Sequence, residues 1–128
     1  MPGTAAEVLI VEDDVQIQRL LTAILNRDGL NAVVAADGKA ALALLETADF
    51  DAIVLDLMLP LVNGFDVLRH LSAAHPAMLE RTVVLTGASE RMYRNSPQIR
   101  QARALLRKPF DVAKLQQEVA ACCAVTHH

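Results

Sequence analysis

The run Val8-Leu9-Ile10-Val11, followed directly by Glu12-Asp13-Asp14, indicates the fold class of this chain. A short, continuous apolar run that ends in charge is typical of a strand buried on both faces, as in a parallel sheet. Apolar residues then recur at helical spacing from Ile17 to Leu25, and Asp28-Gly29 is expected to end that helix. The stretch therefore predicts a buried strand followed by an amphipathic helix.

The same alternation continues along the rest of the chain. Further apolar strands are expected at residues 32–36, 52–56, 82–86 and 104–106. Helices with one apolar face are expected after Asp37-Gly38, after the loop from Pro60 to Gly64, and after Asp111, which would cap the last helix. Five consecutive strand–helix units predict one α/β domain, a doubly wound parallel sheet covered by helices on both faces.

The fourth helix of this series, between Thr86 and Ala104, is interrupted by Pro97. Proline within a helix removes a backbone donor and clashes with the preceding turn. Ser96-Pro97 also matches the pattern of an N-cap followed by a proline in the first turn. We therefore expect the fourth helix to be broken or short near Pro97, or to begin again at Ser96.

The composition excludes several classes of protein. A length of 128 residues suits one domain, and a hydrophobic fraction of 53% excludes a disordered chain. A net charge of −3 with 3% aromatic residues argues against direct binding to nucleic acid. No apolar run approaches the roughly 18 residues needed to cross a membrane, and no secretory signal opens the chain. We expect a cytoplasmic protein.

The two cysteines, Cys122 and Cys123, are adjacent and have no histidine at metal-ligand spacing. Neighbouring cysteines cannot build a disulfide framework, so reduced thiols are expected. The domain is expected to span residues 1–126, and the final pair His127-His128 is interpreted as a remnant of an expression tag.

Polar residues follow the predicted strands where each strand ends. Ligands of open parallel sheets bind at these carboxyl ends, which here carry Glu12-Asp13-Asp14, Asp56, Thr86-Gly87 and Lys108-Pro109. Carboxylates at close range repel one another, and a hard divalent cation such as Mg²⁺ relieves the repulsion. The lysine and the hydroxyl would then bind oxygens of an anion, for which a phosphoryl group is the obvious candidate.

Each of these residues also has a purely structural interpretation. Asp13 or Asp14 could cap the following helix, and Asp56 could be a turn residue. Thr86 alone is more often an ordinary strand-end residue, and Lys108 alone is usually a solvated surface lysine. The agreement of four strand ends favours a functional site.

The ordered set resembles the receiver domain of bacterial two-component response regulators, a module also found alone in the chemotaxis regulator. The matching motifs are Val11-Glu12-Asp13-Asp14, Asp56-Leu57-Met58-Leu59-Pro60 with Asn63-Gly64, Thr86-Gly87, and Lys108-Pro109-Phe110. They cover nearly the whole chain and have the spacing of that family. The resemblance implies a flavodoxin-like (βα)5 fold with five parallel strands in the order 2-1-3-4-5.

The resemblance also implies a phosphoacceptor and a metal site. Asp56 would take a phosphoryl group from a phosphohistidine of a histidine kinase or phosphotransfer protein. Mg²⁺ would be held by Asp13, Asp56 and the backbone carbonyl of Met58, with Glu12 acting through water. The chain would accept and lose its own phosphoryl group without being an enzyme for other substrates.

The remaining motif residues are implied to sense the phosphoryl group. Thr86 and Lys108 would each bind one of its oxygens, and the Lys108-Pro109 peptide is expected to be cis. Phosphorylation adds roughly two negative charges, which would draw Thr86 inward. This would bias a two-state equilibrium across the fourth helix, fifth strand and fifth helix. A downstream protein, an effector domain or a phosphorylation-dependent second copy would bind there.

Several positions depart from the family pattern. Leu105 stands where an aromatic residue usually lies, three positions before the lysine, and Gln101 stands where a glycine usually ends the fourth helix. Together with Pro97 these changes predict a modified output surface. Met58 and Ala88, two positions after the acceptor and after Thr86, cannot orient an attacking water, so we expect a long-lived phosphoryl state.

The sequence fits three other functions less well. A degenerate receiver, acting as a binding module without phosphorylation, usually lacks the acid pair, the acceptor or the lysine. This chain has all of them. A haloacid dehalogenase-like phosphatase needs a second aspartate where this chain has Met58. Flavin binding is disfavoured because no phosphate-cradling loop follows the first strand, and Glu12-Asp13-Asp14 would repel a phosphate.

Overall fold

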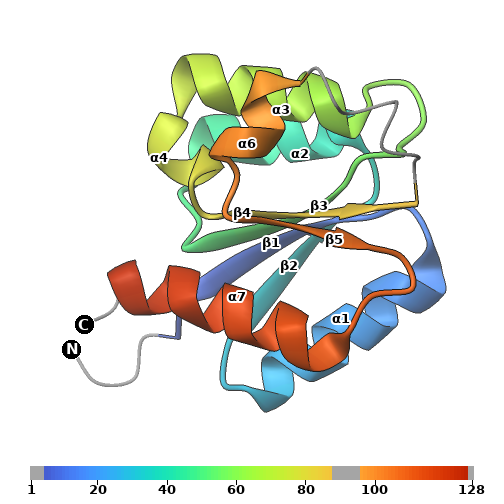
Figure 1. Cartoon of the computed structure of the whole chain (residues 1–128), viewed down its shortest axis with the longest axis vertical. Helices are drawn as coiled ribbons and strands as arrows, with labels where there is room; N and C mark the ends of the chain where they lie inside the picture. Colours follow the sequence, from blue (N-terminus) through green and yellow to red (C-terminus); the bar gives the residue numbers. More distant parts are fainter. Residues whose placement is uncertain (1–4, 88–95, 127–128) are drawn as a thin grey trace.

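A parallel sheet forms the centre of the computed structural model, which describes residues 5–87 and 96–126 (Figure 1). Within these residues the strands are β1 (Glu7–Val11), β2 (Asn31–Ala35), β3 (Ala52–Asp56), β4 (Thr82–Thr86) and β5 (Ala104–Arg107). They pair in parallel in the order β2-β1-β3-β4-β5. The predicted α/β class, the five-stranded parallel sheet and its strand order are confirmed.

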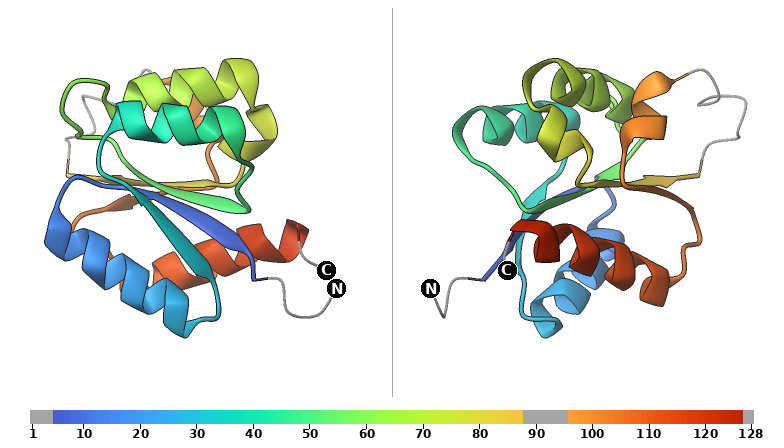
Figure 2. Two further views of the ribbon diagram at one scale, coloured as in Figure 1. Left: turned by 180° about the vertical axis from the view of Figure 1, so that it is seen from behind. Right: turned by 60° about the vertical axis from the view of Figure 1, so that its left-hand side comes forward.

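Helices cover both faces of the sheet (Figures 1 and 2). One face carries α2 (Gly38–Thr47), α3 (Gly64–Ala74), α4 (Pro76–Leu79) and α6 (Pro97–Gln101). The other carries α1 (Val15–Arg27) and α7 (Val112–Thr126). None of the helices in the described part of the chain is long and apolar enough to span a lipid bilayer.

The apolar strands lack alternation because each of their two faces is part of a hydrophobic core. In β1, Leu9 and Val11 point into one core and Val8 and Ile10 into the other. Edge strand β2 differs from this expectation, because Val34 is 39% exposed. An edge strand is paired on only one side, and the apolar run of β2 does not by itself distinguish it from a central strand.

Aspartate side chains cap α2 and α7 at helix starts that the sequence predicted. Asp37 accepts a hydrogen bond from the Ala40 N–H at 2.8 Å, and Asp111 accepts one from the Ala113 N–H at 2.9 Å. Gly29, with φ +82°, follows α1 as its expected stop. Asn63 and Asp66 form a reciprocal capping box at the start of α3. The loop before α3 is therefore fixed at its end, close to Asp56.

The region around Pro97 is a short helix, as expected. Helix α6 begins at Pro97, with Ser96 at the N-cap, and lasts five residues. The N-cap role expected of the Ser96 side chain is wrong, since it makes no capping bond. Its hydroxyl instead lies 3.4 Å from Oε1 of Gln98. Residues 88–95, where the earlier part of a fourth helix was expected, lie outside the described residues.

Helix α4 was not predicted. The sequence indicated that a helix ends near His75-Pro76, and α3 does end at Ala74. Pro76 then occupies the first position of a further turn, α4, where a proline is well tolerated. The same residue thus ends one helix and begins another.

Cys122 and Cys123 are buried on α7, and neither forms a disulfide among the described residues. Burial raises the pKa of both thiols, that of Cys123 to about 11. That these thiols are reduced stays a prediction.

Candidate functional site

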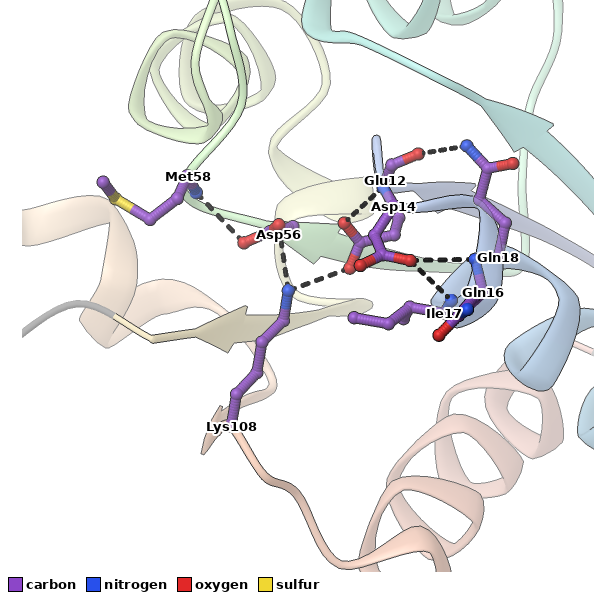
Figure 3. Close-up of polar contacts among 8 residues, drawn as sticks. All are labelled: Glu12, Asp14, Gln16, Ile17, Gln18, Asp56, Met58 and Lys108. Carbon is purple, nitrogen blue, oxygen red and sulfur yellow. Dashed lines mark hydrogen bonds and ion pairs between the residues drawn. The ribbon is translucent and has the colours of Figure 1, made fainter.

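The carboxyl ends of three strands meet at one edge of the sheet (Figure 3). Glu12 directly follows β1, Asp56 is the last residue of β3, and Lys108 directly follows β5. The Lys108 Nζ donates hydrogen bonds to Oε1 of Glu12 at 2.9 Å and to Oδ2 of Asp56 at 3.0 Å. Residues separated by up to 96 positions in the chain therefore form one charged cluster.

One of the neighbours Asp13 and Asp14 caps helix α1, and the other belongs to the acidic cluster. The sequence did not show which residue has which role. The Asp14 side chain caps α1 by accepting hydrogen bonds from the N–H groups of Gln16 and Ile17, at 2.8 and 3.2 Å. The Asp13 carboxylate instead joins those of Glu12 and Asp56, with one oxygen of each lying within 4.8 Å of the others. Asp14 is thus the structural residue of the pair.

Two of the three carboxyl groups in the acidic cluster are buried, which disfavours their charged form. Glu12 is 1% exposed and Asp56 is 3% exposed. Burial raises the pKa of Glu12 to about 7, against the opposing effect of the Lys108 ammonium. For Lys108, burial lowers the pKa, but the hydrogen bonds to Glu12 and Asp56 more than offset this and leave it above its ordinary value. Lys108 therefore stays positively charged at neutral pH.

These residues fit a hard divalent cation. Mg²⁺ prefers oxygen ligands, and it usually binds to one or two carboxylates while keeping several waters. Glu12, Asp13 and Asp56 offer three carboxylates at close range, of which Asp13 is exposed to solvent. One positive charge, that of Lys108, bonds to two of the three carboxylates. A cation bound among these oxygens would offset the remaining negative charge.

The loop after β3 holds the other oxygen of Asp56. The Met58 N–H donates to Oδ1 of Asp56 at 3.0 Å, a contact that the sequence analysis missed because it considered only the Met58 carbonyl. Gly64 packs against the backbone of this loop. A Cβ added to Gly64 would lie 2.5 Å from Cα of Leu57 and 2.6 Å from the Asp56 carbonyl oxygen. Only glycine fits this close approach.

Thr86 lies at the same edge, buried as the last residue of β4. Its backbone carbonyl accepts a hydrogen bond from the Lys108 N–H at 2.8 Å. The Lys108-Pro109 peptide is cis, as expected. All the residues named from the strand ends therefore lie at one edge of the sheet.

The chain is similar to known proteins along most of its length. The family model of the response regulator receiver domain matches residues 8–120. The transcriptional regulatory protein CpxR of Klebsiella pneumoniae is 33% identical over 121 residues, which cover 94% of this chain and 50% of that protein. RegX3 of Mycobacterium bovis, a sensory transduction protein, is 46% identical over 66 residues, 52% of this chain and 29% of that protein. The chain spans about half the length of CpxR.

Solved structures show the same similarity. The receiver domain of the Francisella response regulator 1452 has a TM-score of 0.82 and 27% identity, covering 94% of this chain and 98% of that one. The receiver domain of a sensor histidine kinase from Pseudomonas aeruginosa PAO1, with a magnesium ion in its active-site cleft, also has a TM-score of 0.82 and 27% identity, covering 94% and 99%. This chain therefore belongs to the response regulator receiver domain family of two-component signal transduction.

Proposed function

We propose that Asp56 is the phosphoacceptor of a signalling switch and takes its phosphoryl group from a phosphohistidine on a partner kinase or phosphotransfer protein. The observation that carries this proposal is the environment of its carboxylate. Asp56 is nearly buried, and its two oxygens are held separately by the Met58 N–H and by Lys108. A carboxylate fixed in this way is positioned for attack, and phosphoryl transfer demands little of a protein beyond positioning and charge.

The proposed reaction forms one bond and breaks one. A carboxylate oxygen of Asp56 attacks phosphorus, the P–N bond breaks, and its electron pair returns to the imidazole of the donor. Lys108, 3.0 Å from the Asp56 carboxylate, offsets the negative charge that gathers there. Thr86, on the neighbouring strand end, is proposed to donate its hydroxyl hydrogen to a phosphoryl oxygen of the product.

Mg²⁺ is the proposed cofactor. Asp13, Asp56 and the Met58 backbone carbonyl would hold it, with Glu12 acting through water. When bound there, it would supply positive charge to the carboxylates and to the phosphoryl oxygens. The clustering of the three carboxylates supports this assignment, as does the magnesium ion in the Pseudomonas receiver domain.

Phosphorylation is proposed to act on an output face formed by α6, β5 and α7. Leu105 lies in β5, half-buried against the core under α2 and α3, and has no ring that could turn inward or outward. Helix α6 has only five residues and ends at the exposed Gln101. We propose that a downstream protein, an effector domain or a second copy of the chain recognises this modified face.

The setting of the switch is also a proposal. Residues 1–126 would form one receiver domain that acts in the cytoplasm. The CpxR relatives are named as transcriptional regulators, and this chain spans half of their length. Because the chain carries a net charge of −3, we propose that this domain does not contact DNA itself.

The phosphoryl group is expected to be long-lived. The side chain at position 58 is that of methionine, about half exposed, and it has no group that could orient a water for attack. Ala88, the other position that bears on this expectation, lies outside the described residues.

Intact-mass spectrometry after incubation with acetyl phosphate tests the proposal. We expect a gain of one phosphoryl group that requires Mg²⁺ and is absent from Asp56→Asn. Asp49→Asn, an exposed aspartate just before β3, is the matched control and is expected to react like the wild type. If neither acetyl phosphate nor a beryllofluoride titration changes the protein, the phosphoacceptor proposal is wrong and a binding module is the better interpretation.

A further inference from the structure

Gln18 connects helix α1 to the loop that carries the acidic cluster. Its side-chain Nε2 donates a hydrogen bond of 2.6 Å to the backbone carbonyl of Glu12, six residues earlier (Figure 3). The side chain is half-buried. Figure 3 shows it extending along the loop toward Glu12, on the side away from Lys108.

This contact acts on the peptide group that joins Glu12 to Asp13. The Glu12 N–H donates to the carbonyl of Ala35, on the neighbouring strand β2, at 3.1 Å. Both backbone polar groups of Glu12 are therefore held, one by the sheet and one by Gln18. Because a peptide group is planar, fixing the Glu12 carbonyl also fixes the direction in which the chain continues to Asp13.

Asp13 depends on this backbone more than the other acidic residues do. Asp56 is held by Met58 and Lys108, and Glu12 by Lys108 and the Asp14 N–H. Within residues 5–87 and 96–126, no hydrogen bond reaches the Asp13 carboxylate. Its place in the cluster therefore rests on the backbone conformation alone.

We infer that Gln18 is a positioning residue for Mg²⁺: it fixes the Glu12–Asp13 peptide group and thereby holds the Asp13 carboxylate in the metal site. The inference rests on the proposed function, since it concerns the same site. A glutamine amide suits this task because it donates a hydrogen bond without placing a positive charge beside the acidic cluster. Lysine or arginine would donate but would also repel the cation.

The substitution Gln18→Met tests the inference. Methionine keeps the length and the helix propensity of glutamine but has no donor. Gln16→Met is the matched control, because Gln16 lies on the same turn and is exposed, and its side chain makes no hydrogen bond to any described residue. The first readout is the dissociation constant for Mg²⁺, measured by calorimetric titration of each variant.

We expect Gln18→Met to bind Mg²⁺ about tenfold more weakly than the wild type, as is typical when a residue behind the metal ligands is removed. Gln16→Met is expected to keep the wild-type dissociation constant. With acetyl phosphate as the donor, Gln18→Met should need more Mg²⁺ for half-maximal phosphorylation yet reach the wild-type rate at saturation. A purely structural role would instead lower the melting temperature in EDTA and leave the Mg²⁺ affinity unchanged.

The outcomes separate this inference from the proposed function. If the wild type binds Mg²⁺ and Gln18→Met binds it equally well, the inference is overturned and the proposed function stands. If the wild type binds no Mg²⁺, both are overturned. Gln18→Ala, which also lacks the donor, is to be measured in parallel. Wild-type affinity in either folded variant contradicts the positioning role.

Discussion

Strands β3 and β5 supply the two sides of one ion pair, Asp56 and Lys108, but they are built differently. All five residues of β3 are buried, and the strand is paired on both sides, with β1 and β4. Strand β5 is the outermost strand on one side of the sheet and pairs only with β4. Its residues are half-buried or, at Arg107, exposed. The proposed acceptor thus lies on a fully buried inner strand, and its lysine partner follows a partly exposed edge strand.

This difference indicates which side of the site can respond to phosphorylation. A segment with few buried contacts shifts at a smaller free-energy cost than a fully buried one. New negative charge on Asp56 would act on Lys108, whose backbone N–H is bonded to the Thr86 carbonyl. We therefore expect movement to appear in β5 and the output face while β3 stays in place.

The largest expected effect is on stability, in a matched pair of leucines. Leu55 in β3 and Leu105 in β5 both lie beside Val84 in the strand register and pack on the same core. Leu55→Ala is expected to lower the free energy of unfolding by about 3–4 kcal/mol, because it leaves a cavity in a fully buried site. Leu105→Ala should cost about 1 kcal/mol, since less apolar surface is lost.

Urea unfolding followed by circular dichroism measures both values. Equal losses for the two variants would contradict the contrast between β3 and β5. A loss at Leu105 larger than that at Leu55 would reverse it.

A second, smaller effect concerns the buried side of the site and depends on pH. The pKa of Glu12 is raised by burial from 4.5 to about 7, so between these pH values the folded state holds a proton that the unfolded state has lost. The resulting stabilisation is fully present below the ordinary pKa and is lost as the pH rises through about 7. In EDTA we expect the free energy of unfolding to fall by about 2 kcal/mol from pH 5 to pH 8.

Glu12→Gln removes the titrating group and should flatten this dependence. The measurement is urea unfolding at a series of pH values for both proteins, so that contributions from other groups cancel in the difference. An unchanged pH dependence in Glu12→Gln would show that Glu12 is not the group responsible.

The smallest expected effect lies in the loop that follows β3. Leu61 is 91% exposed and has φ +61°, a conformation that costs a leucine roughly 1 kcal/mol. Leu61→Gly should therefore raise the free energy of unfolding by about 0.5–1 kcal/mol. Leu61→Ala, which keeps the Cβ, is expected to leave it unchanged. A melting temperature for Leu61→Gly below that of Leu61→Ala would rule out backbone strain at this position.

The sequence predicted those parts of the fold and the site that are encoded locally. Strand β3 is a five-residue run of apolar residues that ends with Asp56, so neighbouring residues were enough to predict both the strand and the acid at its end. The cap at Asp111 is likewise a short-range signal that the structure confirms. The exposure of β2 and β5 depends on which strands lie at the edges, which the runs themselves do not show.

The unpredicted parts of the site depend on contacts that form only in the folded chain. Asp13 and Asp14 are chemically identical neighbours, so only the backbone shows which of them caps α1 and which joins the cluster. The hydrogen bonds from Gln18 and from the Met58 N–H likewise arise from loop geometry. Glutamine at an ordinary helical position carries no sequence signal of such a role.

The proposed phosphoacceptor can be identified by locating the phosphoryl group in the chain. Treatment of the phosphorylated protein with borohydride reduces an acyl phosphate to an alcohol, so the modified aspartate becomes homoserine. Peptide mass spectrometry then identifies its position. We expect homoserine at position 56 and an unmodified Asp13. Homoserine at another aspartate, or phosphorylation that leaves Asp56 intact, would contradict it.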